Sequence, residues 1–296
     1  MNLHENVARD YLAALGMLRL VQQLWPEQEP RLAWEAKQGY PKISTITPLS
    51  SSWPSIVVSS LQNLEKDPAH PLKHGKKIKT ECSNFRTAVL GALAFAKQPV
   101  PLAGIPALLY ASYSSQLSGE EENFVDPTRL SFGNDQSGKN LLLDVCELIA
   151  GLDADEFLES LLGNRKPVAK KSLRWNPVEF RPSAYRSHDP VDDKHLDQPT
   201  HNVLAFIGLT FYPTVPSSVG VATLGFPSEH QSFFHWPIWS DPLTADEVAT
   251  LVHQLPCING EIDRRVLCGY GAKRIWRSRR FSSDKSLYFA PAELVG

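Results

Sequence analysis

Residues 270–281 of this chain read YGAKRIWRSRRF, and the pattern over positions 273–281 predicts a β-strand. The strand carries five cations with no acid among them: Lys273, Arg274, Arg277, Arg279 and Arg280. Because successive side chains of a strand point to opposite faces, these cations would occupy both faces. A half-buried strand of a sheet has one apolar face, so the pattern is not typical of one. We therefore expect an edge strand, or an arm that lies in a groove.

Trp276 lies in the middle of these cations, where its ring can stack on a base or on a guanidinium. Neutralisation of phosphates and stacking on aromatic rings are the two main contributions to sequence-tolerant nucleic-acid binding. Lysine and arginine are also the residues with which natural edge strands block pairing with other sheets. On this segment alone, nucleic-acid binding and a solvated edge strand are both open hypotheses.

The chain has 296 residues, of which 42% are hydrophobic, and this suits one large domain or two modest ones. Its formal net charge is −2, so any binding to nucleic acid must come from local patches. None of the four cysteines forms a Cys-x-x-Cys pair, which argues against a zinc ribbon and favours reduced thiols. The apolar run at 11–21 is too short to span a bilayer and does not resemble a signal peptide. We therefore expect a cytoplasmic protein with no membrane partner.

The spacing of apolar residues divides the chain into two regions. Helical periodicity predicts helices at 6–23, 85–96, 137–150, 154–162, 202–211 and 245–253. Aromatic and β-branched runs predict strands at 31–36, 128–132, 172–175, 219–226, 233–239, 264–270 and 287–289. We predict an α+β fold with a helix-rich region at 1–163, a basic linker at 164–172 and a strand-rich region at 173–296. The two regions would pack as one or two domains.

Two further groups of cations are candidates for phosphate contacts. One lies in a polar loop and the other near the predicted linker: Lys73, Lys76, Lys77 and Lys79, and Lys166, Lys170, Lys171 and Arg174. Residues 133–139 read GNDQSGK, but Asn140 stands where a phosphate-binding loop carries its Mg²⁺-binding hydroxyl. We interpret this segment as a strand-to-helix turn with a free helix N-terminus. Such a terminus suits a phosphate, and Lys139 would reinforce it.

The strongest catalytic candidate is the segment 188–195, which reads HDPVDDKH. Asp192, Asp193 and Lys194 resemble the two carboxylates and the lysine of metal-dependent nucleases. Three consecutive side chains of a strand point to alternating faces, however, and the surrounding residues are rich in turn formers. A polar surface loop explains the segment more simply, and the nine histidines form no His-Glu-x-x-His motif. We expect no catalytic residue, no metal and no cofactor, and keep the nuclease as an alternative.

Several strings occur in an order that adds to this interpretation. They are YLAALGMLRLV at 11–21, TRLSF at 128–132, LRWNP at 173–177, HNVLAF at 201–206, FYPTVP at 211–216, ATLGF at 222–226 and WPIW at 236–239. Together they resemble the Cas8-type large-subunit family of type I CRISPR effector (Cascade) complexes, particularly the type I-G group, formerly I-U. Asn176 departs from that pattern, because an aspartate is expected there.

The resemblance implies a non-catalytic subunit of a crRNA-guided surveillance complex. Such a subunit contributes to recognition of the motif that flanks the target (the PAM), to binding of target DNA and to recruitment of a separate helicase–nuclease. Its implied partners are crRNA, target DNA, and the backbone and crRNA-end-capping subunits of the complex. In guided systems base pairing reads the sequence, while protein reads the flanking motif and holds the backbones. A purely structural interaction scaffold is a further alternative.

Overall fold

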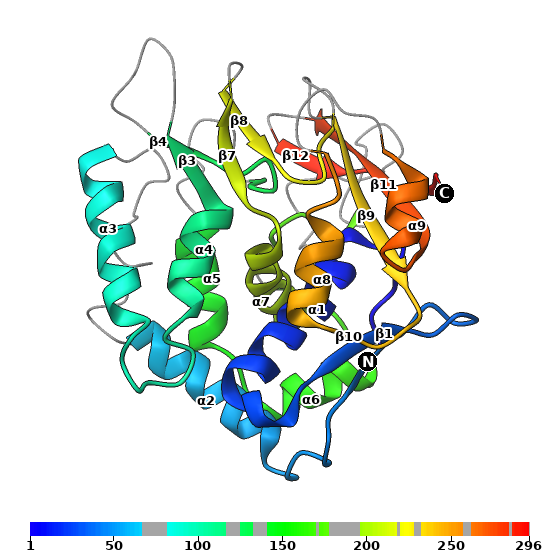
Figure 1. The fold of residues 1–296 in the computed structure, drawn as a ribbon. Helices are drawn as coiled ribbons and strands as arrows, with labels where there is room; N and C mark the ends of the chain where they lie inside the picture. Colours follow the sequence, from blue (N-terminus) through cyan, green and yellow to red (C-terminus); the bar gives the residue numbers. More distant parts are fainter. Residues whose placement is uncertain are drawn as a thin grey trace, which may run out of the picture.

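The structure is a computed structural model that describes residues 1–66, 82–116, 125–132, 141–169, 172–177, 196–217, 220–227, 232–256, 262–283 and 286–295. Helices concentrate in the N-terminal half and strands in the C-terminal half (Figure 1), which confirms the α+β fold class. The helices are α1 (Ala8–Leu24), α2 (Trp53–Lys66), α3 (Cys82–Phe95), α4 (Ile105–Tyr113), α5 (Leu141–Ala150), α6 (Ala154–Leu162), α7 (Pro199–Gly208), α8 (Ala245–Val252) and α9 (Arg264–Gly269).

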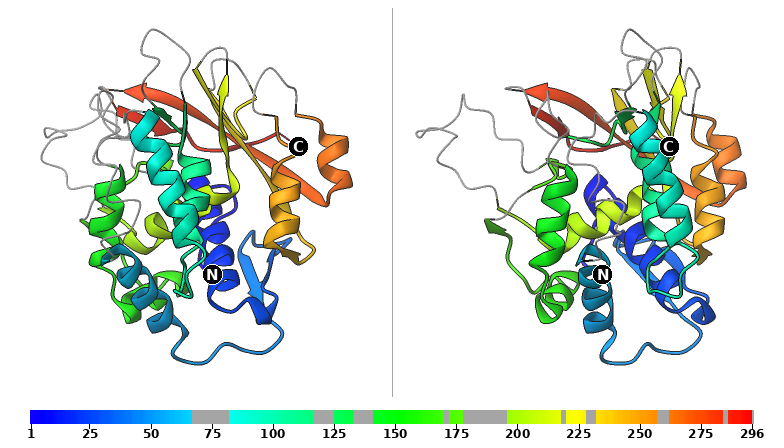
Figure 2. Two further views of the ribbon diagram at one scale, coloured as in Figure 1. Left: turned by 60° about the vertical axis from the view of Figure 1, so that its left-hand side comes forward. Right: turned by 90° about the vertical axis from the view of Figure 1, so that its left-hand side faces the viewer.

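Helix α1 lies at the centre of the molecule and packs along α7 (Figures 1 and 2). Every residue from Ala8 to Val21 is buried, as expected of a helix that is apolar on nearly all sides. The two helices approach closely because each presents a glycine to the other. A Cβ on Gly16 would lie 1.8 Å from the carbonyl oxygen of Leu204, and one on Gly208 would lie 2.0 Å from that of Leu12. Only glycine therefore fits at these two positions.

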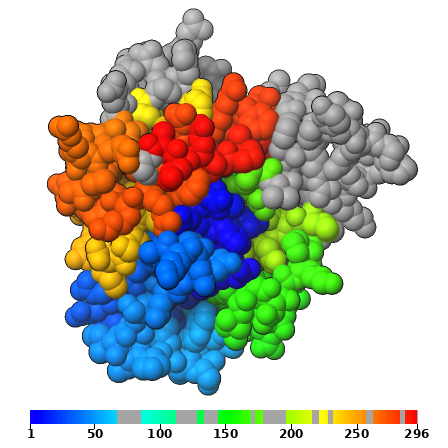
Figure 3. Space-filling view, turned by 90° about the vertical axis from the view of Figure 1, so that its right-hand side faces the viewer, coloured from blue at the N-terminus to red at the C-terminus, as the bar shows by residue number. Residues whose placement is uncertain are grey.

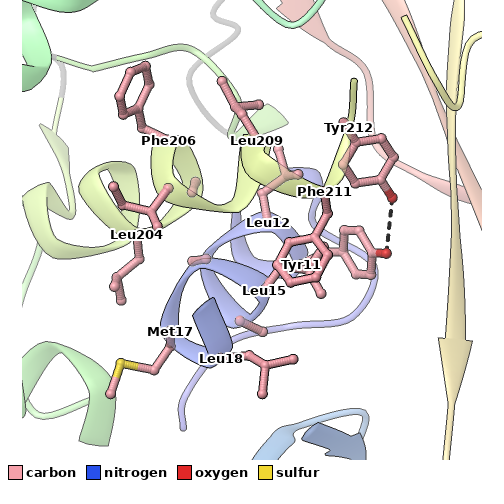
Figure 4. Close-up of a cluster of buried hydrophobic side chains, with 14 of the residues drawn as sticks. Tyr11, Leu12, Leu15, Met17, Leu18, Leu204, Phe206, Leu209, Phe211 and Tyr212 are labelled. Carbon is pink, nitrogen blue, oxygen red and sulfur yellow. Dashed lines mark hydrogen bonds between the residues drawn. The ribbon is translucent and has the colours of Figure 1, made fainter. Parts of the chain in front are cut away.

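An aromatic cluster around Tyr11 joins the helices to the strands. The Tyr11 ring lies within 6.5 Å of the rings of Trp34, Trp236, Trp239 and Tyr212, measured between ring centroids. The hydroxyl of Tyr212 donates a hydrogen bond to that of Tyr11 over 3.0 Å (Figure 4). Burial raises the pKa of Tyr11, so both hydroxyls stay protonated in this cluster.

Two of the sheets have more than two strands. One has the order β10–β1–β2, from β1 (Arg31–Trp34), β2 (Pro41–Ser44) and β10 (Leu243–Thr244). The other centres on β11 (Ala272–Ser283), which pairs with β9 (Phe233–Trp239), β12 (Ser286–Phe289) and β13 (Glu293–Leu294), all antiparallel. Three two-stranded pairs complete the set: β3 (Ser114–Gln116) with β4 (Val125–Pro127), β5 (Val168–Ala169) with β6 (Leu196–Asp197), and β7 (Thr214–Ser217) with β8 (Gly220–Thr223).

The two sequence regions share one hydrophobic core. Buried residues of α1, α2, α5 and α6 belong to the same cluster as those of α7, β9 and β11. Strand β1 from the first region also pairs with β10 from the second. The predicted linker includes β5, which pairs with β6. In the described part of the chain, no helix combines the length and the apolar character needed to cross a membrane.

Three segments that were predicted as strands have a different structure. Residues 264–270 were predicted as a strand, but they form α9 and the residue that ends it. The side chain of Asp263 accepts hydrogen bonds from the backbone N–H groups of Arg265 and Val266, so a helix cap outweighs the β-branched and aromatic composition. Residues 128–132 and 172–175 were also predicted as strands and are irregular. There the backbone bonds to side chains instead, for example Arg129 N to Thr223 Oγ1 over 2.9 Å.

Candidate nucleic-acid interface

Strand β11 is the central strand of its sheet, so the prediction of an edge strand was wrong. Strand β9 pairs along one edge of β11, from Ala272 to Arg279, and β12 and β13 pair along the other. Its cations are tolerated inside a sheet because ion pairs, aromatic rings and solvent each accommodate some of them. The five cations therefore have different surroundings, and they do not form one continuous basic surface.

Arg274 and Trp276 are both engaged by Glu5, from the opposite end of the chain. The guanidinium of Arg274 lies 2.7 Å from Glu5 Oε2, and Trp276 Nε1 donates to Glu5 Oε1 over 3.3 Å. Glu5 is only 8% exposed, and its backbone carbonyl accepts a hydrogen bond from the buried Trp236. Figure 3 shows the N-terminal segment directly beneath the C-terminal strands. Arg274 and Trp276 thus join these two segments, which gives both a structural role.

The pKa of Glu5 reflects this surrounding. Burial raises the pKa of its carboxyl group, while the charge of Arg274 and the hydrogen bond from Trp276 lower it by a smaller amount. The net direction is upward, so the ion pair with Arg274 only partly offsets the loss of water around Glu5.

Arg277 is also paired within the molecule. Its Nε donates to Glu293 Oε1 over 2.7 Å, and its guanidinium lies over the Phe233 ring at 4.9 Å from the centroid. Across the strand pair lies His235, which is 6% exposed. Burial lowers the pKa of His235, and the charge of Arg277 lowers it further. A hydrogen bond to the backbone of Gly225 raises this pKa, but it does not reverse the shift. His235 is therefore held neutral beside Arg277 at physiological pH.

Lys273 and Arg279 are exposed to solvent and form no side-chain ion pair or hydrogen bond in the described structure. Lys273 sits where the register between β11 and β9 shifts, so the bulge turns it out of the ladder. Helix α9 leads directly into this end of β11 and adds two more exposed cations, Arg264 and Arg265, with Tyr270 at 48% exposure. The sequence analysis did not identify Arg264 and Arg265 as candidates. An aspartate followed by two arginines is typical of the exposed start of a helix, and this pattern could have identified them.

Arg280 has a third kind of surrounding. Its guanidinium lies over Phe132 at 5.8 Å from the ring centroid, and its Nε is buried without a hydrogen-bond acceptor. Burial, with the charge of Arg129 as the second cause, lowers the pKa of Arg280 to about 10. Arg280 thus remains charged at neutral pH in a position where water is largely excluded.

The remaining sequence candidates divide into two groups. Lys166 is exposed, and Arg174 lies over the ring of Tyr288 at 5.6 Å from the centroid. The others fall outside the described residues: Lys73, Lys76, Lys77, Lys79, Lys139, Lys170 and Lys171. The nuclease candidates Asp192, Asp193 and Lys194 also fall outside them. Of these two further groups of cations, the structure therefore describes only Lys166 and Arg174.

A buried polar cluster at the start of α1 and α7 was not found by the sequence analysis. Arg9 pairs with Asp10 over 2.7 Å and also with Asp197, and Asp197 accepts a hydrogen bond from Asn202 over 2.6 Å. The ring of His201 lies 3.5 Å from Asp10. Burial alone would raise the pKa of Asp10, but the charge of Arg9 and the adjacent His201 outweigh burial and hold that pKa well below its ordinary value.

This cluster has the residue types of a catalytic site but not the access. All of its charged side chains are less than 10% exposed, and they bond to one another. We interpret it as a structural network that fixes α1, α7 and β6 to one another. Within the described ranges, no group of three or more histidine, cysteine or acidic residues is placed to hold a metal ion.

A comparison of the chain with protein-family models, curated proteins and solved structures finds no match. The resemblance to the Cas8-type family therefore stays a prediction that depends on the ordered strings of the sequence.

Proposed function

We propose that this chain is a non-catalytic, nucleic-acid-binding subunit of a crRNA-guided complex of the type I CRISPR kind. Its partners would be crRNA, target DNA, other effector subunits and a helicase–nuclease that acts separately. The ordered strings that resemble the Cas8-type family support this identity. Recognition of the flanking motif and a cytoplasmic location belong to the same proposal.

The observation that carries the nucleic-acid part is the exposed cations at β11 and α9. Lys273, Arg279, Arg264 and Arg265 all reach solvent, and Tyr270 lies exposed between the helix and the strand. Because exposed cations keep their full charge and lose little on desolvation, they are well suited to contact phosphates. An exposed tyrosine beside them offers a ring for stacking.

The proposed contact set is therefore narrower than the five cations of β11. Arg274 and Arg277 already have acidic partners, and using them would break ion pairs with Glu5 and Glu293. Trp276 is packed against the core and bonded to Glu5, so its ring is not free to stack on a base. We assign the phosphate contacts to Lys273 and Arg279, with Arg264 and Arg265 extending the surface.

The test compares binding of a fluorescent single-stranded DNA or RNA to the protein at several salt concentrations. The double variant Lys273→Gln/Arg279→Gln should bind more weakly and flatten the dependence of log K on log salt. The slope should fall by about 0.7 for each phosphate contact that is lost, the value for a single strand. An unchanged slope would reject the assignment of these two residues.

A matched control is Arg31→Gln. Arg31 is a partly exposed cation on β1, which pairs with β2 and β10 and not with β11, and its charge is paired with Glu247 at 3.3 Å. This variant should bind nucleic acid as the unaltered protein does. A second measurement addresses the identity of the complex: the chain, expressed with its genomic neighbours, should co-purify with a small RNA of repeat-derived sequence.

A structural interaction scaffold remains a second candidate because of α3. Two leucines on this helix, Leu90 and Leu93, are 58% and 49% exposed. Apolar helix faces of this kind are typical of contacts with another protein subunit. If α3 is such a contact, Leu90→Glu should prevent assembly with the other subunits while the isolated chain stays folded.

A further inference from the structure

Gly91, inside α3, is a helical glycine that no contact of the described structure requires. A glycine in the middle of a helix is unfavourable relative to alanine. At Gly16 and Gly208 the close approach of α1 and α7 accounts for the glycine, because an added Cβ would meet the backbone of the facing helix. At Gly91 an added Cβ would meet nothing within 4 Å, and the residue is exposed. Another helix has room for an equally close approach at this position.

The face of α3 around this glycine is apolar and exposed. Leu90 and Leu93 are 58% and 49% exposed, and Ala94 is exposed as well. The opposite face of the helix is anchored in the molecule, where Ala92 is 0% and Phe95 is 3% exposed. Helix α3 lies outside α4 at the edge of the molecule (Figure 1). The orientation of α3 is therefore fixed, and its two exposed leucines cannot turn inward.

A cation marks each end of this face. Arg86 and Lys97 are exposed, and neither forms an ion pair or a side-chain hydrogen bond within the described residues. They lie 97 − 86 = 11 positions apart, which is three helical turns, so they share the face of Leu90 and are separated by about 16 Å along the axis. Residues 82–116 contain no aspartate or glutamate. The face is thus apolar in its middle and positive at both ends.

This distribution of charge selects the partner. A second copy of α3 would place Arg86 against Arg86 if the helices ran parallel, and Arg86 against Lys97 if they ran antiparallel. Both arrangements bring like charges together, which disfavours association. A nucleic acid would meet two leucines where it needs donors for its phosphates. A helix with an apolar stripe and an acidic residue near each end of that stripe complements both the leucines and the cations.

We propose that the face of α3 formed by Leu90, Gly91, Leu93 and Ala94 binds an amphipathic helix of another protein, with acidic residues flanking its apolar stripe. The inference rests on the scaffold, the second candidate function, and names the chemistry of its partner. The partner helix approaches closely over Gly91 and Ala94, and its apolar side chains pack against the two leucines.

The experiment measures the binding of two fluorescent synthetic peptides to the purified full-length protein by fluorescence anisotropy. Both peptides are amphipathic helices with the same stripe of leucine and alanine. One carries glutamates at both ends of the stripe, and the other carries lysines at those positions. We expect the acidic peptide to bind about tenfold or more tightly than the basic one, with a smaller difference at high salt.

Substitution of a leucine tests the apolar part of the face. Leu90→Glu should weaken binding of the acidic peptide by about tenfold or more, because it places a charge in the centre of the contact. Leu162→Glu is the matched control, since Leu162 is a 61% exposed leucine at the end of α6. The control variant should bind the peptide as the unaltered protein does.

Gly91→Ala tests the close approach. The added methyl group should weaken binding of the acidic peptide by about fivefold or more, because it overfills a closely packed contact. The same variant should not lower the unfolding temperature of the isolated protein, since the methyl group meets no atom of the described structure there. Weaker binding by an equally stable protein separates a role in docking from a role in folding.

Substitution of the cations tests the choice of partner. The double variant Arg86→Gln/Lys97→Gln should bind the acidic and the basic peptide with equal affinity. Its affinity for the acidic peptide should also depend less on salt than that of the unaltered protein.

Several outcomes would overturn the proposal. One is that the unaltered protein binds neither peptide or binds both equally, and another is that Leu90→Glu and Gly91→Ala leave the affinity unchanged. Self-association that Leu90→Glu abolishes, measured by analytical ultracentrifugation, would identify a second copy as the occupant. Binding to vesicles of anionic lipid that Leu90→Glu abolishes would identify a membrane surface instead.

The result is separable from that of the nucleic-acid proposal, which concerns Lys273 and Arg279. Peptide binding that depends on Leu90, without any nucleic-acid binding, supports the docking site and rejects the nucleic-acid function. Salt-dependent nucleic-acid binding without any peptide binding does the reverse.

Discussion

The contact between α1 and α7 predicts opposite effects for the same substitution at two glycines. Gly16 lies at the crossing of the two buried helices, where an added Cβ would be 1.8 Å from the carbonyl oxygen of Leu204. Gly91 lies in α3, also within a helix, and an added Cβ there meets nothing within 4 Å. Gly16→Ala should therefore destabilise the protein, while Gly91→Ala should stabilise it.

The magnitude follows from how far the helices must move. Ordinary contact begins at 3.4 Å, so the distance of 1.8 Å falls short by 3.4 − 1.8 = 1.6 Å. A backbone carbonyl inside α7 cannot rotate away, so the helices themselves must separate. A gap of about 0.5 to 1 Å already removes a quarter to a half of the dispersion energy across an interface. We expect a cost at or above the upper end of overpacking, about 3 kcal/mol.

The helix propensity of alanine opposes this cost but is too small to cancel it. Alanine is favoured over glycine in a helix interior by about 1 kcal/mol. At Gly16 the net loss of unfolding free energy is then about 2 kcal/mol or more. At Gly91 only the favourable part remains, about 0.5 to 1 kcal/mol. Domains of this kind are stable by about 5 to 15 kcal/mol, so both variants should still fold.

The assay is urea unfolding followed by far-ultraviolet circular dichroism and tryptophan fluorescence. Gly208→Ala should resemble Gly16→Ala, because its Cβ would lie 2.0 Å from the carbonyl oxygen of Leu12 on the facing helix. The double variant should cost less than the two single costs together, since one separation of the helices relieves both clashes. If Gly16→Ala were as stable as Gly91→Ala, the close approach of the helices would be refuted.

Three further predictions concern buried polar groups. Asp10→Asn should lower the unfolding free energy by about 3 kcal/mol, because the buried charge of Arg9 then loses the carboxylate of Asp10 at 2.7 Å. The pKa of Asp10 in the folded protein lies below its ordinary value. The stability that the ionised carboxyl group contributes is therefore fully present above the ordinary pKa, and it is lost as the pH falls through the folded pKa. Measurements of unfolding free energy at decreasing pH should show this loss in the unaltered protein and not in Asp10→Asn. Glu5→Ala should cost about 1 to 3 kcal/mol in urea unfolding, because Arg274 and Trp276 both lose their hydrogen-bond acceptor. Trp175→Phe should cost about 1 to 3 kcal/mol, because the buried indole no longer donates to the Leu130 carbonyl over 2.7 Å; equal stability would contradict that hydrogen bond.

Local patterns in the sequence were enough to predict the α+β class and most of the helices and strands. The periodicity at 154–162 predicted α6 with the bounds that the structure shows, and the aromatic run at 233–239 predicted β9. The pattern failed at 264–270, where a cap by Asp263 outweighed the composition. Such a cap depends on the backbone geometry of one turn, which the residue types around it do not settle by themselves.

The sequence by itself determined where the cations are and that they outnumber the acids along 273–281. Only the tertiary structure decided which of these cations pair with an acidic side chain of the same molecule and which can bind an external anion. Arg274 meets Glu5, 269 positions away, while Arg277 meets Glu293 across a strand pair and Arg280 meets neither. The physical reason is that an ion pair depends on distance in space, and residues at opposite ends of the chain become neighbours only when the core has formed.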